Sequence, residues 1–273
     1  MQEILQHRHL PDTDRLSLLS ATILLAYALA RFVDLPIREL AVQLPGLYLS
    51  LGINLRTLVT FLVAGVTASG ADWLLRAHPR LGEKSTIEHW LLPTLTAWVI
   101  GLPLFQLPLG LTWWGGFAIG GSLLMLVLVA EYITVDPEDM RHPIAAAGLT
   151  AVSFALFLSL VVALRYSGTR LVLFLPGMAL ACALVSLRTL HLRLHGRWAF
   201  LQAGLTALVC AQLAAPLHYW PLSPVSMGLA LLGPAYALTS LMANLGENKP
   251  MHQALVEPLV VLVIVWGCAV WVK

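Results

Sequence analysis

The stretch Trp113–Pro143, WWGGFAIGGSLLMLVLVAEYITVDPEDMRHP, decides the fold of this chain. It opens on two tryptophans and continues through an uncharged run from Gly115 to Ala130, which is long enough to cross most of a hydrocarbon layer. It closes on a dense cluster of ionisable residues that begins at Glu131. Aromatic residues at one end and charges at the other are typical of a transmembrane helix. We therefore predict that the rest of the chain forms further spans packed around this one.

The composition of the 273-residue chain agrees with a membrane location. Apolar residues make up 59% of the chain and charged residues only 11%, whereas about a quarter of the residues in soluble domains are charged. The mean hydropathy of +0.82 requires much of this apolar surface to face lipid. The net charge of +2 is too small to suggest a nucleic-acid partner. The three cysteines have no disulfide or zinc spacing, and we predict neither a metal nor a cofactor.

We predict an all-α, polytopic transmembrane bundle of about nine spans in a single domain, because about 20 apolar residues cross a bilayer. Residues 1–15 are polar and are expected to form a cytoplasmic tail. Residues 34–54 are amphipathic and contain two prolines, so we expect this segment to lie along the membrane interface or to dip into it. The predicted spans are Leu16–Val33, Leu55–Leu75, His89–Gln106, Trp113–Ile133, Ile144–Leu164, Leu171–Leu190, Trp198–Ala215, Val225–Ala243 and Ala254–Val272.

Basic residues orient these spans, because cytoplasmic connections carry the excess of Lys and Arg. With nine spans, one side holds ten of them and the other six. We therefore expect a cytoplasmic N-terminus and an external C-terminus. Similar charge and proline patterns in spans one to four and five to eight leave two interpretations open. They indicate either a parallel four-span repeat with a ninth span appended, or chance similarity among leucine-rich segments.

Ionisable residues near the span ends form a candidate polar cluster. The run Asp136-Pro137-Glu138-Asp139 is typical of a helix start, with Asp136 as the cap and Pro137 in the first turn. Alternatively, Glu131 and Asp136 join other carboxylates to hold a divalent cation or a basic partner. Asp72 and Arg76 are spaced i to i+4 and are expected to pair. The candidate cluster comprises Asp72, Arg76, Glu131, Asp136, Arg141, His142 and Glu257.

A second group of residues lies near span ends on the predicted outer side. Arginine binds phosphate through two N–H groups and aromatic rings line a wall, so these residues could form a pocket for an anionic head group. The alternative is ordinary anchoring at the interface. The candidates are Arg165, Tyr166, Arg170, His218, Tyr219 and Trp220. In addition, Gly116 and Gly120 form a G-x-x-x-G pattern, which predicts close helix packing inside the bundle or against another subunit.

Four segments carry a resemblance to a known group of proteins. They are TASGADWLLRAHP (67–79), HWLLPTLTAWVIGLPL (89–104), AEYITVDPED (130–139) and LHYWPL (217–222). With these segments the chain resembles an uncharacterised family of bacterial multi-spanning membrane proteins. The resemblance implies a bacterial cytoplasmic membrane and a shared fold, and it implies no activity.

Three functions remain open. The chain has no H-E-x-x-H, G-x-S-x-G or P-loop motif, and the middle of each predicted span lacks ionisable residues. We therefore expect a non-enzymatic protein that packs against the bilayer and other membrane proteins, or against itself, as an accessory subunit, scaffold or assembly factor. The first alternative is a carrier or flippase for a lipid or other amphiphile. The second is a lipid head-group enzyme at the cytoplasmic rim, which requires three carboxylates to converge: Asp72, Glu131 and Asp136.

Overall fold

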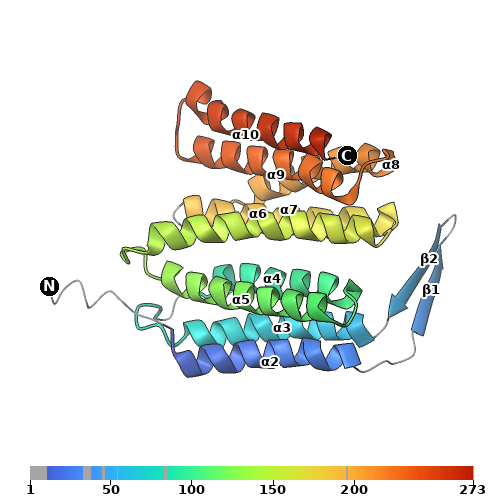
Figure 1. The fold of residues 1–273 in the computed structure, drawn as a ribbon. Helices are drawn as coiled ribbons and strands as arrows, with labels where there is room; N and C mark the ends of the chain where they lie inside the picture. The colour runs from blue at the N-terminus through green and yellow to red at the C-terminus, as the bar shows by residue number, and fades with distance from the viewer. Residues whose placement is uncertain are drawn as a thin grey trace. The chain divides into compact units, whose positions relative to one another are not determined.

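The computed structural model describes residues 11–32, 38–44, 47–53, 55–82, 85–194 and 196–272. Nine helices dominate this described part of the chain (Figure 1). The predicted helical transmembrane bundle is confirmed, because eight of the nine are long and apolar enough to cross a membrane. The helices are α2 (Thr13–Phe32), α3 (Leu55–Leu75), α4 (Ile87–Gln106), α5 (Leu111–Thr134), α6 (His142–Tyr166), α7 (Leu171–Arg193), α8 (Phe200–Tyr219), α9 (Pro224–Gly246) and α10 (Met251–Trp271).

The helix outside the eight is α4. It contains 20 residues, as many as α2. Its first turn carries Glu88 and His89, and two prolines, Pro93 and Pro103, lie inside it. These residues lower its apolar content but not its length. Half of its residues are buried among its neighbours.

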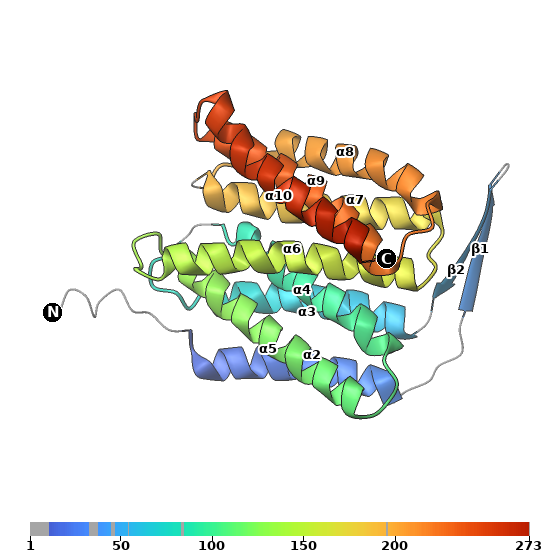
Figure 2. The ribbon, with the colours of Figure 1, turned by 45° about the horizontal axis from the view of Figure 1, so that its top comes forward.

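The chain divides into two compact units, Met1–Asp139 and Met140–Lys273. Unit 1 contains α2 to α5, in which α2 packs on α3 and α5, and α4 packs between α3 and α5. Unit 2 contains α6 to α10, in which α6 packs on α7 and α9, and α8 packs between α7 and α9. The first four helices of each unit therefore have the same order of neighbours, as a four-helix repeat requires. The additional helix of unit 2, α10, lies against α9 (Figures 1 and 2).

Two short strands interrupt the helical pattern. β1 (Arg38–Leu44) pairs antiparallel with β2 (Leu47–Ile53), with Leu44 opposite Leu47. These strands cover most of the segment 34–54 that we expected at the interface. The remaining residues of that segment, and residues 1–10 of the predicted tail, lie outside the described residues.

The core of unit 1 is built around aromatic side chains. Tyr27 on α2 is 2% exposed and donates a hydrogen bond to the Ala97 carbonyl of α4. Trp113 on α5 is 1% exposed and donates its indole N–H to the Leu104 carbonyl at 3.1 Å. In a lipid environment a buried N–H or O–H without an acceptor is costly. Each ring therefore fills the core and also forms a hydrogen bond to a neighbouring helix.

Gly116 and Gly120 lie at the contact between α5 and α4. A methyl group added at Gly120 would lie 2.6 Å from Cγ2 of Ile100, and one added at Gly116 would lie 2.9 Å from Cδ1 of Leu107. The glycines thus allow the two helices to approach closely inside unit 1.

The predicted helix start at Asp136 is wrong, because α6 begins at His142. Asp136 instead organises a turn: its Oδ1 accepts the backbone N–H of Glu138 at 3.0 Å. The same oxygen accepts a hydrogen bond from Arg80 at 2.8 Å. The ion pair with Arg80 therefore keeps Asp136 in the turn between α5 and α6. Pro143 lies in the first turn of α6.

Candidate functional site

The predicted pair on α3 is present in the structure. The Nε of Arg76 lies 2.8 Å from Oδ2 of Asp72, as the i to i+4 spacing indicated. Thr86, just before α4, donates its hydroxyl to the other oxygen of Asp72. Asp72 therefore joins the end of α3 to the start of α4.

Glu131 pairs with a histidine inside unit 1. Its Oε2 lies 2.8 Å from Nδ1 of His89 on α4, and the two side chains are 1% and 8% exposed. The Thr134 hydroxyl donates to the Glu131 backbone carbonyl at 2.9 Å and lies 3.4 Å from Oε2. The structure therefore buries Glu131 in the contact between α4 and α5.

Asp136 and Glu138 share one arginine. Nη1 of Arg80 lies 2.8 Å from Asp136 and 2.7 Å from Glu138. The hydrogen bond to Glu138, together with the charge of Asp136, outweighs partial desolvation and raises the pKa of Arg80 above its ordinary value. The second carboxylate oxygen of Asp136 is buried and has no hydrogen-bond partner among the described residues.

The three carboxylates of the head-group enzyme hypothesis have separate partners. Asp72, Glu131 and Asp136 pair with Arg76, His89 and Arg80 respectively. Among the described residues no group of three or more His, Cys, Asp or Glu side chains is close enough to hold a metal ion. The other members of the candidate cluster belong to unit 2: Arg141 and His142 at the start of α6, and Glu257 on α10.

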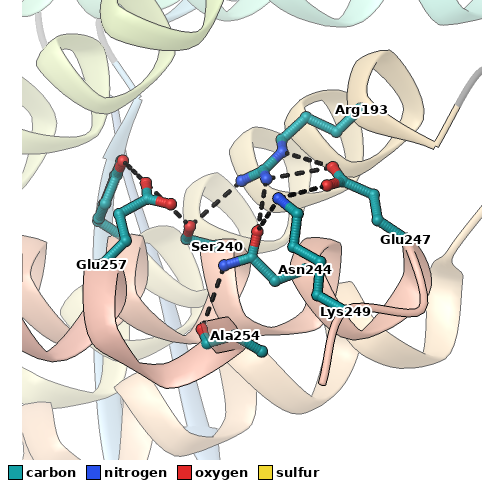
Figure 3. Close-up of polar contacts among 8 residues, drawn as sticks. Arg193, Ser240, Asn244, Glu247, Lys249, Ala254 and Glu257 are labelled. Atoms are coloured by element: carbon teal, nitrogen blue, oxygen red, sulfur yellow. Dashed lines mark hydrogen bonds and ion pairs between the residues drawn. The ribbon is translucent and has the colours of Figure 1, made fainter. Parts of the chain in front are cut away.

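Unit 2 contains a polar network centred on Arg193, the last residue of α7 (Figure 3). Its guanidinium donates to Ser240 at 3.2 Å, to Asn244 at 2.7 Å and to Glu247 at 3.2 Å. Lys249 completes the group, 2.7 Å from the other oxygen of Glu247 and 3.0 Å from the Asn244 amide oxygen. The network joins α7, α9 and the connection to α10.

Glu247 lies just beyond the end of α9. Partial burial acts to raise its pKa, but the hydrogen bond from Lys249 and the charges of Arg193 and Lys249 together lower the pKa below its ordinary value. Glu257 extends the network onto α10, where its Oε1 accepts hydrogen bonds from Tyr236 at 2.8 Å and from Ser240 at 3.3 Å.

The opposite end of unit 2 holds the predicted head-group residues. The Arg165 guanidinium donates to the backbone carbonyls of His218 at 2.9 Å and Trp220 at 3.2 Å. These carbonyls lie where α8 ends and would otherwise lack helical donors. Tyr219 and Trp220 are 78% and 63% exposed, and Tyr166, at the end of α6, is 72% exposed. Arg170 is exposed at the start of α7. We call this region the Arg165 end of unit 2.

A cavity of about 870 Å³ opens at the same end, between α8, α9 and α10. Its wall is mostly apolar and includes two indole rings, Trp220 and Trp266. Its two hydroxyl groups, on Ser223 and Ser226, both donate to the Val272 carbonyl at the end of α10. The cavity residues are Leu213, Pro216, Leu217, Trp220, Pro221, Leu222, Ser223, Ser226, Ala230, Trp266, Ala269 and Val270.

A proline on α9 helps to hold the Trp266 ring in the wall of this cavity. Pro234 on α9 has no N–H, so the Ala230 carbonyl four residues earlier lacks its usual helical donor. The Trp266 indole of α10 donates to that carbonyl at 3.1 Å. A methyl group at Gly233 would lie 3.1 Å from Trp266 Cδ1, so glycine leaves room for the ring.

The reciprocal contact occurs at the other end of the same helix pair. Pro258 on α10 leaves the Ala254 carbonyl without its helical donor. The Asn244 amide of α9 donates to it at 3.1 Å (Figure 3). Each helix therefore satisfies the carbonyl that the other helix's proline leaves open, which fixes how α9 and α10 pack.

Comparison with known proteins identifies a family but no function. A model of the family described as "Protein of unknown function (DUF5656)" matches residues 35–272. The chain belongs to this family. The predicted resemblance to an uncharacterised membrane-protein family is thus confirmed. No curated protein and no solved structure matches this DUF5656 chain.

Sequence reasoning missed most of the Arg193 network and the whole cavity of this DUF5656 protein. One usable signal was the four-residue spacing of Tyr236, Ser240 and Asn244, which aligns them on one face of α9. A second signal was the pair of helical prolines, because each implies a carbonyl that needs another donor. The cavity had no such signal, since its residues come from three helices and a connection.

Proposed function

We propose that this multi-pass membrane protein binds and carries a lipid or another amphiphile, with the cavity between α8, α9 and α10 as its site. The single observation that supports this function is the size and chemistry of that cavity. Its volume of about 870 Å³ lies within the range of about 300–1,000 Å³ that is typical of small-molecule sites. An apolar chain is the group that such a wall stabilises best.

The polar atoms around the cavity favour the same kind of ligand. The Ser223 and Ser226 hydroxyls already donate to Val272, and the Trp266 N–H already donates to Ala230. Because these donors already have acceptors within the chain, an apolar ligand tail beside them leaves no hydrogen bond unmade. The fixed indole supplies a flat apolar surface at little entropic cost, which favours binding in a preformed site.

A second candidate function is that of an accessory subunit, scaffold or assembly factor. It is favoured by α10, of which only 17% is buried within the chain. One face of α10 is exposed along its length and could receive a helix of another membrane protein or of a second copy. Its exposed apolar residues include Val256, Leu259, Val260, Val263, Ile264 and Val270.

The proposal includes a location and an orientation. We propose a bacterial cytoplasmic membrane, with α4 as the ninth span and the N-terminus in the cytoplasm. The support is the excess of Lys and Arg, ten against six, on the N-terminal side. In this orientation the Arg165 end of unit 2 faces outward.

Native mass spectrometry of the detergent-purified chain tests amphiphile binding. Dioleoyl phosphatidylglycerol and dioleoyl phosphatidylcholine are added in turn, and the retained lipid is counted per chain. We expect one molecule of at least one lipid per chain, and we expect Leu213→Trp, which fills the cavity, to remove most of it.

The matched control is Leu208→Trp, at a 56% exposed position of the same helix outside the cavity. Circular dichroism verifies that both variants fold. Retention of neither lipid by the wild-type chain contradicts the proposed function, as does equal retention by both variants. Stable co-purification of a second membrane protein along α10 would favour the accessory role instead.

A further inference from the structure

The charges of unit 2 are strongly asymmetric. Residues 140–273 contain eight Lys and Arg residues but only two acidic side chains, Glu247 and Glu257. Both carboxylates belong to the network that contains Arg193 and Lys249. Both acidic side chains of unit 2 therefore lie at the same end of the unit, in the Arg193 network.

Glu247 and Glu257 lie too far from the Arg165 end to neutralise its positive charges. Glu247 directly follows α9, whereas the Arg165 end includes Ser223, the cap at the other terminus of α9. The 23 residues of α9 separate these points by about 34 Å at about 1.5 Å per residue. Exposed charges are largely screened beyond about 8 Å at physiological ionic strength. The positive charges of Arg165 and Arg170 therefore lie far from both acidic side chains of unit 2.

Arg165 is held at the edge of the cavity. It donates to the Trp220 carbonyl at 3.2 Å, and Trp220 is one of the cavity residues. Its acceptors are carbonyls, which leave its positive charge in place. Two acceptors use two of the five N–H donors of a guanidinium. The described residues include no ion-pair partner for Arg165 or for Arg170.

On this basis, and resting on the proposed function, we infer that the ligand of the cavity is an anionic amphiphile. Its apolar tail lies between α8, α9 and α10, and its phosphate or carboxylate head group contacts Arg165 and Arg170. Arginine suits this head group because its planar donors match the oxygens of phosphate and carboxylate. Because no described acidic side chain pairs with Arg165 or Arg170, their charge favours an anionic head over a zwitterionic one.

A comparison of the affinities for two lipids with identical tails tests the inference. Dioleoyl phosphatidylglycerol and dioleoyl phosphatidylcholine are titrated separately into the detergent-purified chain, and bound lipid is measured by native mass spectrometry. We expect phosphatidylglycerol to bind more tightly, and Arg170→Gln to weaken it by about fivefold with no change for phosphatidylcholine. The control is Arg197→Gln, which removes the same charge from an exposed position between α7 and α8. It should leave both affinities unchanged.

Arg165→Gln should weaken phosphatidylglycerol binding by a similar factor. Because Arg165 also caps α8, Arg165→Lys, which keeps the charge, is measured beside it, and Arg170→Gln carries the test if Arg165→Gln does not fold. Equal binding of the two lipids overturns the inference but leaves the proposed function intact. Complete displacement of phosphatidylglycerol by millimolar inorganic phosphate also overturns it, since the head group alone would then be the ligand. Retention of neither lipid contradicts the proposed function itself.

Discussion

Unit 1 and unit 2 share the order of four neighbouring helices but differ in charge and in the way they satisfy buried polar groups. Residues 1–139 contain twelve Asp and Glu residues and eight Lys and Arg residues, whereas residues 140–273 contain two and eight. The same helical arrangement thus accommodates opposite charge balances. The shared order of helices comes from apolar packing, whereas the two units differ in their charges and in a few polar contacts.

Unit 1 contains a buried ionisable pair, His89 with Glu131, between two helices, beside the neutral donors Tyr27 and Trp113. In unit 2 the α9–α10 contact relies on neutral donors, because the Trp266 indole and the Asn244 amide each meet a carbonyl opened by a proline. A buried ionisable pair is expensive when one partner is lost. A neutral hydrogen bond to a carbonyl costs less to break. We therefore expect a larger effect from removing Glu131 than from removing the indole N–H of Trp266.

The largest effect is expected for Glu131→Ala. Loss of the carboxylate leaves His89 buried without this partner, and removal of one member of a buried pair typically lowers the free energy of unfolding by about 3–5 kcal/mol. Unfolding in mixed micelles, followed by circular dichroism, measures the change. The double variant His89→Leu with Glu131→Leu should recover part of the loss. Asp14→Ala, at an exposed position in the first turn of α2, should cost no more than about 1 kcal/mol. A Glu131→Ala cost as small as this control would remove the contrast between the units.

An intermediate effect is expected for Trp266→Phe. The ring remains, but the Ala230 carbonyl loses its donor, which should lower the free energy of unfolding by about 1–2 kcal/mol. In a Pro234→Ala background the backbone N–H returns, so the cost of Trp266→Phe should fall clearly. The two costs form a double-mutant cycle whose coupling measures the proline-linked hydrogen bond. Trp271→Phe, at a position on the same helix that is 89% exposed, is the matched control. Additive effects would show that the indole does not serve the carbonyl that Pro234 opens.

The smallest effect concerns pH. Because the pKa of Glu247 is lower in the folded chain than its ordinary value, its ionised form stabilises the fold above the unfolded pKa, and this contribution is lost as pH falls through the lower folded pKa. Between about pH 6 and about pH 3.5, the wild-type chain should lose about 1 kcal/mol more than Glu247→Gln. Unfolding midpoints of both chains across this interval measure the difference. Parallel pH profiles would mean that Arg193 and Lys249 do not stabilise the carboxylate.

The helices could be predicted because apolar length alone requires them in lipid. The predicted span Trp113–Ile133 corresponds to α5, whose start differs by two residues and whose end differs by one, and the predicted span Leu55–Leu75 has the same bounds as α3. The local pair Asp72–Arg76 was predictable for a similar reason, since i to i+4 spacing fixes neighbours on a helix. The turn at Asp136 was not predictable, because Arg80, 56 residues away in the sequence, donates a hydrogen bond to Asp136 there.

By itself, the sequence determined that the chain is a membrane helix bundle, where each helix lies along the chain, and which end of unit 2 lacks carboxylates. These properties follow from composition and from distances along the chain. The tertiary structure alone decided that His89 meets Glu131, that Trp266 and Asn244 fill the gaps left by prolines on a neighbouring helix, and that a cavity remains beside Trp220. Such contacts depend on how helices far apart in sequence pack, and no local pattern records that geometry.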